Sequence, residues 1–202
     1  MEQISNTRQI ILKAAYKLFL LNNVEKVTIE KIEKITNKIR GTIFYYFKDK
    51  QAIFDAVVEE MFFPSISLPA ELIDIATTLS FEHFLELYKS CEHRFMSQIK
   101  DLYDDIENPG IAWYNFISQA NKYYPDFNGK LGKIIQKDYN VCKHLIQIAQ
   151  EKNEIKNLDS KKLTLLFLEI ASGTAFQNAF LPLPDFECKL SNSQIYQILR
   201  TV

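Results

Sequence analysis

Apolar residues recur at intervals of three and four along most of this chain, and that spacing places them on one face of an α-helix. The first such stripe runs through Ile11, Ala14, Leu18 and Phe19. Only 5 glycines and 6 prolines occur in 202 residues, so the chain lacks the breakers that the many turns of an all-β fold require. The pattern predicts an all-α protein.

The N-terminal quarter predicts four helices, the third of them at about residues 39–46. Proline has no backbone N–H, so Pro64 is expected to end the fourth helix. Side chains that favour caps and tight turns mark the other boundaries. They are Ser5, Asn6 and Thr7 before the first helix, Asn22 and Asn23 after it, Thr28 before the second, Asn37 after it and Asp49 before the fourth.

We expect two domains. A small domain of three helices, containing a helix-turn-helix, would cover residues 1–48, and a larger helical body would cover residues 49–202, with a linker near 64–69. Apolar stripes in the body predict helices at about 81–100, after Pro109 and Gly110, at about 129–152, at 163–181 and from about 192.

Charge is distributed unevenly between the two parts. Residues 1–55 carry 10 basic and 6 acidic side chains, a net charge of +4, whereas residues 56–202 carry 14 basic and 19 acidic ones, a net charge of −5. A positive region attached to an acidic body indicates an anionic partner at the N-terminal end.

The sequence lacks the residue patterns that are characteristic of several other classes of protein. The three cysteines are odd in number and far apart, which argues against a disulfide framework and favours a reducing cytoplasm. No apolar run is long enough for a membrane span or a signal peptide. His83, His93 and His144 do not pair on one helix face, so no metal site, cofactor or enzymatic activity is expected.

The stretch from Arg8 to Phe54 resembles the TetR (tetracycline-repressor-like) family of transcriptional regulators. The resemblance rests above all on the run from Arg40 to Phe47, RGTIFYYF, with Thr28 before it and Lys50 after it at ungapped spacing. It implies a helix-turn-helix whose last helix enters the major groove of double-stranded DNA. Contacts with bases and phosphates are then expected from Lys38, Arg40, Gly41, Thr42, Tyr45, Tyr46, Lys50 and Thr28.

Five residues depart from the family pattern, one of them Lys38, which stands where an apolar residue is usual. Ile39 stands where a capping serine or threonine is usual, and a lost cap costs about 1 kcal/mol. Phe44 lacks the hydroxyl of the usual tyrosine, Glu33 adds a negative charge near DNA, and Asn37 replaces the turn glycine at modest cost. These departures leave an alternative open, a helical ligand-binding or protein-interaction dimer that has lost operator binding.

The resemblance also implies a homodimer on a palindromic operator. The helix at 163–181 has a face of small residues besides its apolar face, and a helix buried on both faces needs more neighbours than one small body supplies. A central core helix is the alternative. The residues expected at the dimer interface are Phe167, Ala171, Ala175, Ala179, Ile195 and Leu199.

Aromatic residues are concentrated in the body, which permits a cavity for a small, largely apolar or aromatic effector. Glu92 falls within an aromatic stripe, where a lone carboxylate is costly unless it is paired. Ordinary core packing is the alternative for the aromatics, and an ion pair for Glu92. The candidate ligand-binding residues are Phe84, Tyr88, Glu92, Phe95, Trp113, Phe116 and Tyr139. The sequence thus predicts a ligand-responsive DNA-binding regulator, a repressor that a small molecule releases from DNA.

Overall fold

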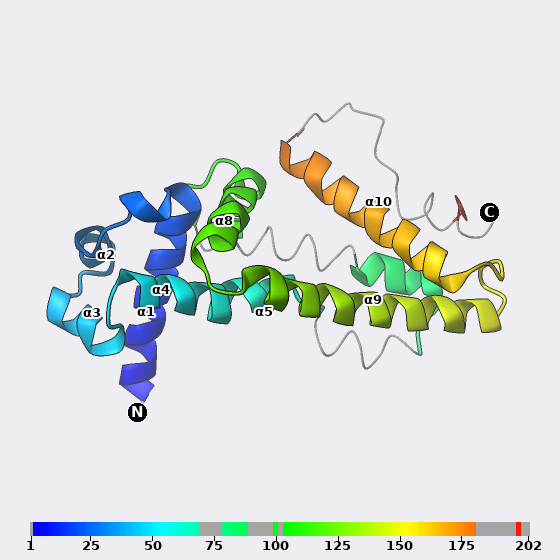
Figure 1. Cartoon of the computed structure of the whole chain (residues 1–202), viewed down its shortest axis with the longest axis horizontal. Coiled ribbons are helices and arrows are strands. Elements are labelled where there is room, and N and C mark those ends of the chain that lie inside the picture. The colour runs from blue at the N-terminus through cyan, green and yellow to red at the C-terminus, as the bar shows by residue number, and fades with distance from the viewer. Residues whose placement is uncertain (1, 69–77, 89–98, 101–102, 181–196, 199–202) are drawn as a thin grey trace. The chain divides into compact units, whose positions relative to one another are not determined.

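The computed structural model describes residues 2–68, 78–88, 99–100, 103–180 and 197–198. Every regular element in this part of the chain is a helix, which confirms the all-α prediction (Figure 1). None of the described helices has the length and apolar character needed to cross a membrane. The elements are α1 Glu2–Leu21, η1 Val24–Lys26, α2 Ile29–Thr36, α3 Arg40–Tyr46, α4 Lys50–Val57, η2 Val58–Phe62, α5 Phe63–Ile66, α8 Pro109–Tyr123, α9 Phe127–Glu151 and α10 Ser160–Phe180.

The chain divides into two compact units. The first unit consists of Met1–Ile66 and Tyr103–Leu131, and the second of Ser67–Leu102 and Gly132–Val202. Helices α1 to α5 and α8 therefore belong to the first unit, and α10 and the helical residues 81–88 to the second. The sequence predicts a boundary between residues 48 and 49 that separates a DNA-binding domain from the helical body. The compact units are defined by packing and not by DNA binding, so they do not test this boundary, and it stays a prediction.

Caps and the turn form where the sequence predicts them. The side-chain oxygen of Thr28 accepts a hydrogen bond of 3.3 Å from the Lys31 N–H at the start of α2. Asp49 accepts one of 2.8 Å from the Ala52 N–H at the start of α4. Asn37 ends α2 in the left-handed conformation, with φ of 52°. Local chemistry therefore fixes the helix-turn-helix boundaries.

Two of the expected helix boundaries are wrong. Helix α1 already begins at Glu2, so the expected caps at residues 5–7 lie inside it. Helix α4 does not end at Pro64, because it passes into the π-helical segment η2 and then into α5. The Phe63 N–H bonds to the Val58 carbonyl, five residues back. Pro64 then lies in the first turn of α5, where a missing N–H is tolerated, and the expected linker is helical as far as Ile66.

Aromatic rings form the core of the first unit. The centroids of Phe19 in α1 and Phe54 in α4 are 5.0 Å apart, and those of Phe54 and Phe116 in α8 are 5.7 Å apart. All three side chains are fully buried. Burial of this much apolar surface stabilises the arrangement of α1, α4 and α8, and α2 packs on α1.

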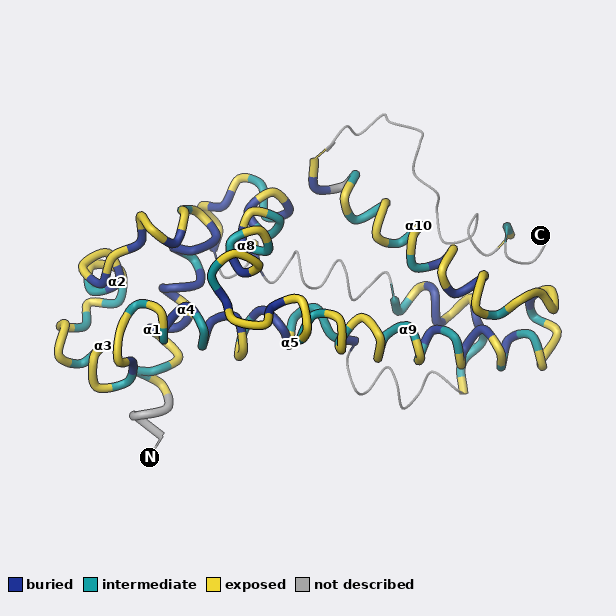
Figure 2. The backbone as a smooth tube through the Cα atoms, in the orientation of Figure 1, coloured by how far each residue is buried: buried dark blue, intermediate teal, exposed yellow. Residues whose placement is uncertain are grey.

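The core of the second unit joins α9, α10 and residues 81–88. Phe84, Cys142, Ile146 and Phe167 belong to one buried cluster. From Cys142 onward helix α9 is buried along one side and exposed along the other, as its spacing of apolar residues predicts, whereas residues 128–141 are partly or fully exposed (Figure 2). Its bounds, those of α10 and the start of α8 lie within three residues of the predicted positions.

Candidate nucleic-acid interface

Helix α3 is anchored by one face and exposes the other. Ile43 is fully buried and Phe47, which ends the helix, is 4% exposed. The predicted loss of a cap is confirmed, because Ile39 precedes the helix without a side-chain hydrogen bond. Most of the remaining α3 residues are exposed or partly exposed (Figure 2). A short, half-anchored helix of this kind presents a surface that the protein itself does not cover.

Arg40 and Phe44 contact each other on this exposed surface. The Arg40 guanidinium lies 5.5 Å from the centre of the Phe44 ring, a cation–π distance worth about 0.5–1 kcal/mol at an exposed site. Phe44 has no hydroxyl for a phosphate, but its ring weakly favours this position of the guanidinium. The neighbouring rings of Tyr45 and Tyr46 meet edge to face at 5.0 Å, and Tyr45 is 75% exposed.

The other predicted contact residues lie around the same helix. Thr42 and Lys38 are partly exposed, and Gly41 is exposed with no neighbouring atom where a side chain would begin. Thr28 is exposed, and its oxygen is engaged in the cap of α2. The described structure thus gathers Lys38, Arg40, Gly41, Thr42, Tyr45 and Tyr46 on one short segment. Their contacts with DNA stay a prediction.

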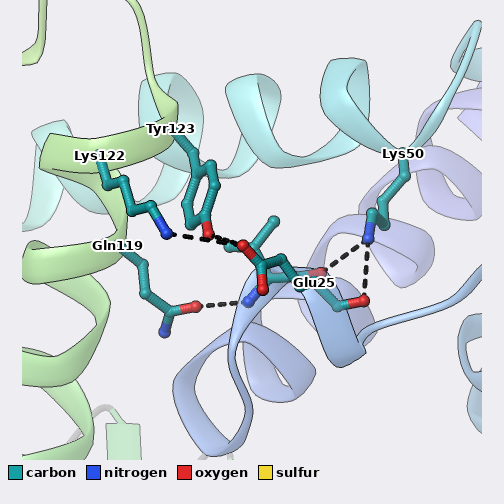
Figure 3. A network of polar contacts seen from close by, with 6 residues as sticks. Glu25, Lys50, Gln119, Lys122 and Tyr123 are labelled. Atoms are coloured by element: carbon teal, nitrogen blue, oxygen red, sulfur yellow. Dashed lines mark hydrogen bonds and ion pairs between the residues drawn. The ribbon is translucent and has the colours of Figure 1, made fainter.

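Lys50 has a role inside the protein that its sequence position does not indicate. Its ammonium donates to the Val24 carbonyl at 2.7 Å and lies 3.5 Å from the Glu25 carbonyl (Figure 3). Both carbonyls belong to η1, the turn between α1 and α2. Lys50 therefore ties the start of α4 to the turn that leads into the helix-turn-helix.

Side chains of helix α8 also form hydrogen bonds to η1 and to the end of α1. Gln119 accepts a hydrogen bond of 2.5 Å from the Val24 N–H and donates one of 3.3 Å to the Phe19 carbonyl. The hydroxyl of Tyr123 donates to the Glu25 carboxylate, which also lies 3.5 Å from the Lys122 ammonium (Figure 3). The sequence gives no sign of these contacts, because they join residues about a hundred positions apart.

The charges of this network favour its formation. The hydrogen bond from the Tyr123 hydroxyl has the largest effect on the pKa of Glu25, and the Lys122 ammonium has the next largest. Both lower this pKa, so the carboxylate stays ionised. Gln51 adds a hydrogen bond of 3.0 Å to the Tyr123 carbonyl at the end of α8. We call Lys50, Gln119, Lys122, Tyr123 and Glu25 the η1 clamp.

A second contact, the ion pair between Arg8 and Glu60, joins α1 to η2 near the end of α3. The Arg8 guanidinium donates to both carboxylate oxygens of Glu60 at 2.5 Å, and it lies 5.2 Å from the centre of the Phe47 ring. Such a two-pronged bond fixes the guanidinium plane. Arg8 is thereby engaged within the protein, at the end of α3.

The described ligand-binding candidates fall into both units. Phe116 is fully buried in the first unit, and Trp113 lies there 6.1 Å from Phe62, centre to centre. Phe84 and Tyr88 pack on Phe167 in the second unit, and Tyr139 in the same unit is partly buried. Glu92 and Phe95 lie outside the described residues. A cavity of about 10 Å³ beside Phe84 has room for about one water molecule, so the effector site stays a prediction.

Helix α10 exposes an apolar face that differs from the predicted one. Phe167 and Ala179 are buried within the single chain, whereas Ala171 and Ala175 are partly exposed, and Ile195 and Leu199 lie outside the described residues. The exposed apolar side chains share one side of the helix by their spacing. They are Leu165, Leu166, Phe176 and Phe180.

Ionisable residues of the body offer little other chemistry. Asp138 is partly buried, and loss of hydration raises its pKa to about 6. His83 and His144 are exposed. Among the described residues no group of three or more histidine, cysteine or carboxylate side chains could hold a metal ion.

Known proteins similar to this chain share its N-terminal region. Residues 11–57 match the family described as bacterial regulatory proteins, tetR family. The chain is 40% identical over 55 residues to the HTH-type transcriptional repressor AcnR of Corynebacterium efficiens, covering 27% of this chain and 29% of AcnR. It is 34% identical over 86 residues to the HTH-type transcriptional repressor BepR of Brucella suis biovar 1, covering 42% of this chain and 40% of BepR. The matched regions therefore span less than half of either relative.

The fold extends this similarity beyond the matched residues. A TetR-family transcriptional regulator from Cytophaga hutchinsonii superimposes with a TM-score of 0.64 at 14% identity, covering 99% of this chain and 94% of that one. The matched residues 11–57 contain α2, α3 and α4 and therefore the exposed surface of α3, together with Glu25 and Lys50 of the η1 clamp.

Proposed function

We propose that this chain, whose residues 11–57 match the tetR family of bacterial regulatory proteins, is a DNA-binding transcriptional regulator of that family, a repressor that a small molecule releases from its operator. The repressor assignment is supported by the names of AcnR and BepR, the HTH-type transcriptional repressors to which parts of this chain are similar. In this role the protein works in the cytoplasm, where the DNA is, and catalyses no reaction.

One observation carries the proposal. Helix α3 is anchored by the buried Ile43 and Phe47 and turns Arg40 outward, with its guanidinium held over the Phe44 ring. A guanidinium presented in this way can bond to both acceptors of a guanine edge in the major groove. Lys38, Thr42, Tyr45 and Tyr46 supply donors for the phosphates on either side.

A dimer completes the proposed mode of binding. A single helix-turn-helix covers one half-site, so two copies would hold their α3 helices about 34–36 Å apart, one turn of DNA. The exposed apolar side chains of α10 are the proposed contact between copies, to which Ile195 and Leu199 would add. By their spacing, the predicted interface residues Ala171 and Ala175 lie on a different side of α10. An exposed apolar face on a helix is stabilised when a second copy covers it.

The proposed effector is a small, largely apolar or aromatic molecule bound in the helical body. It releases DNA only if it binds the form with low operator affinity more tightly than the form with high affinity. The candidates in the second unit, Phe84, Tyr88, Glu92, Phe95 and Tyr139, are the proposed contacts.

Binding to DNA that flanks the protein's own gene tests this proposal. A fluorescence-anisotropy titration between about 50 and about 200 mM salt should give an affinity that falls steeply with salt, because each phosphate contact releases counterions. Absence of binding at the lowest salt would favour the alternative, a helical ligand-binding or protein-interaction dimer. The uncapped start of α3 at Ile39 is the feature of the structure that suits that alternative.

A further inference from the structure

Ile39 is an apolar side chain held in the open beside the charged residues of the candidate interface. It is 75% exposed, as much as Tyr45 and more than any other aliphatic side chain in the described part of the chain. Its neighbours in sequence are Lys38 and Arg40, both predicted DNA contacts. An exposed isoleucine at a capping position loses the cap and gains no packing within the protein.

The backbone fixes the direction of this side chain. Ile39 is extended, with φ of −71° and ψ of 153°, and its carbonyl accepts hydrogen bonds from the Thr42 N–H at 2.9 Å and the Ile43 N–H at 3.3 Å. Ile43, one helical turn later, is fully buried. The extended backbone therefore turns Ile39 away from the face that Ile43 anchors.

The chemistry of the side chain limits what it can contact on DNA. Isoleucine has neither a donor nor an acceptor, so it can bond neither to a phosphate nor to the polar edge of a base. The exposed edges of base pairs in the major groove carry one apolar group, the C5-methyl of thymine. Charged neighbours on both sides favour DNA over a protein partner as the surface that covers Ile39.

We propose that Ile39 determines sequence specificity by contacting the methyl group of a thymine in each operator half-site, beside the base pair that Arg40 reads. This inference rests on the proposed function, since it requires α3 to enter the major groove. The proposal assigns a function to the isoleucine at position 39, where the family usually has a capping serine or threonine. The contact adds discrimination where a hydroxyl would have stabilised the start of the helix.

Replacement of single thymines by deoxyuridine isolates the methyl group. A duplex is first selected from a random library with the wild-type protein, and each thymine of its half-sites is then replaced in turn. Removal of one buried methyl group should weaken wild-type binding about fourfold per half-site, from the usual transfer free energy of such a group. Ile39→Ala should bind the thymine and deoxyuridine duplexes equally at that position.

Two further duplexes and a control variant sharpen the result. With 5-methylcytosine in place of that thymine, the wild type should bind more tightly than with cytosine, whereas Ile39→Ala should not distinguish them. Ile135→Ala, at an exposed isoleucine of α9 in the second unit, should keep the wild-type preference. Circular dichroism melting confirms that all variants are folded.

The outcomes separate the two proposals. A thymine whose methyl group matters to the wild type but not to Ile39→Ala supports the contact. Equal sensitivity of both proteins at every thymine, or no sensitivity at all, overturns it and leaves the regulator proposal intact. A selection that enriches no duplex overturns the regulator proposal itself.

Discussion

Gln119 offers a sharp test of how the helix-turn-helix is held in place. Its side chain joins the Val24 N–H at 2.5 Å and the Phe19 carbonyl at 3.3 Å, and Val24 is 4% exposed. Gln119→Ala removes both hydrogen bonds and leaves a nearly buried N–H without a partner. Each bond contributes about 1 kcal/mol net, so the variant should lose about 2 kcal/mol of stability. For a chain of this size that is a fall of about 4–8 °C in melting temperature.

Two further variants separate the clamp from a general effect of the substitution. Gln119→Glu keeps the acceptor for Val24 but sets a carboxylate oxygen against the Phe19 carbonyl, so at neutral pH it should lose stability as well. Gln136→Ala removes an exposed glutamine of α9 that bonds only to Asn140, at 3.1 Å among the described contacts, and should change stability by less than about 0.5 kcal/mol. Circular dichroism melting measures all three. If Gln119→Ala melts together with Gln136→Ala, the η1 clamp does not stabilise the first unit.

The remaining predictions concern pH and assembly. Loss of hydration raises the pKa of Asp138 to about 6, so the ionised carboxylate destabilises the fold above that pH. Asp138→Asn should therefore raise the melting temperature at pH 8 and have little effect near pH 4. The hydrogen bond from Lys130 is the main cause that lowers the pKa of Glu59, so the stabilising effect of the Glu59 charge is lost as the pH falls. Glu59→Gln should therefore lower the melting temperature at pH 7 and not at about pH 3. The decrease should be small, because the ion pair is half exposed. Leu165→Glu, on the exposed face of α10, should convert a dimer into folded monomers in sedimentation velocity, and a wild type that is monomeric at micromolar concentration would refute the proposed interface.

Local sequence chemistry predicted the helix-turn-helix well. Thr28 and Asp49 cap helices where expected, and Asn37 takes the left-handed conformation that the turn requires. These outcomes depend on a few neighbouring residues, so the sequence alone can specify them. The missing cap at Ile39 was predicted for the same reason, since it follows from the side chain at a single position.

Features that depend on distant residues could not be predicted in this way. Lys50 sits at a position where the family resemblance implied a phosphate contact, yet its ammonium bonds to η1 carbonyls about 25 residues earlier. The grip of Gln119 and Tyr123 on η1 likewise joins segments that only the folded core brings together. Pro64 was expected to break a helix, and the π-helical segment before it accommodates the missing N–H instead. The exposed face of α10 depends on which side Phe84 and Tyr88 cover.

The central claim is that the exposed face of α3 binds DNA, and a matched pair of charge removals tests it most directly. Arg40→Ala removes an exposed cation from α3, and Lys133→Ala removes one from α9 in the second unit. Anisotropy titrations on the DNA that flanks the protein's own gene should show a loss of about 5- to 150-fold for Arg40→Ala, the range for one two-pronged base contact. Lys133→Ala should stay within about twofold of the wild type, because surface changes away from a binding site have small effects. Wild-type affinity in both variants, or an equal loss in both, would contradict the assignment of α3 as the recognition helix.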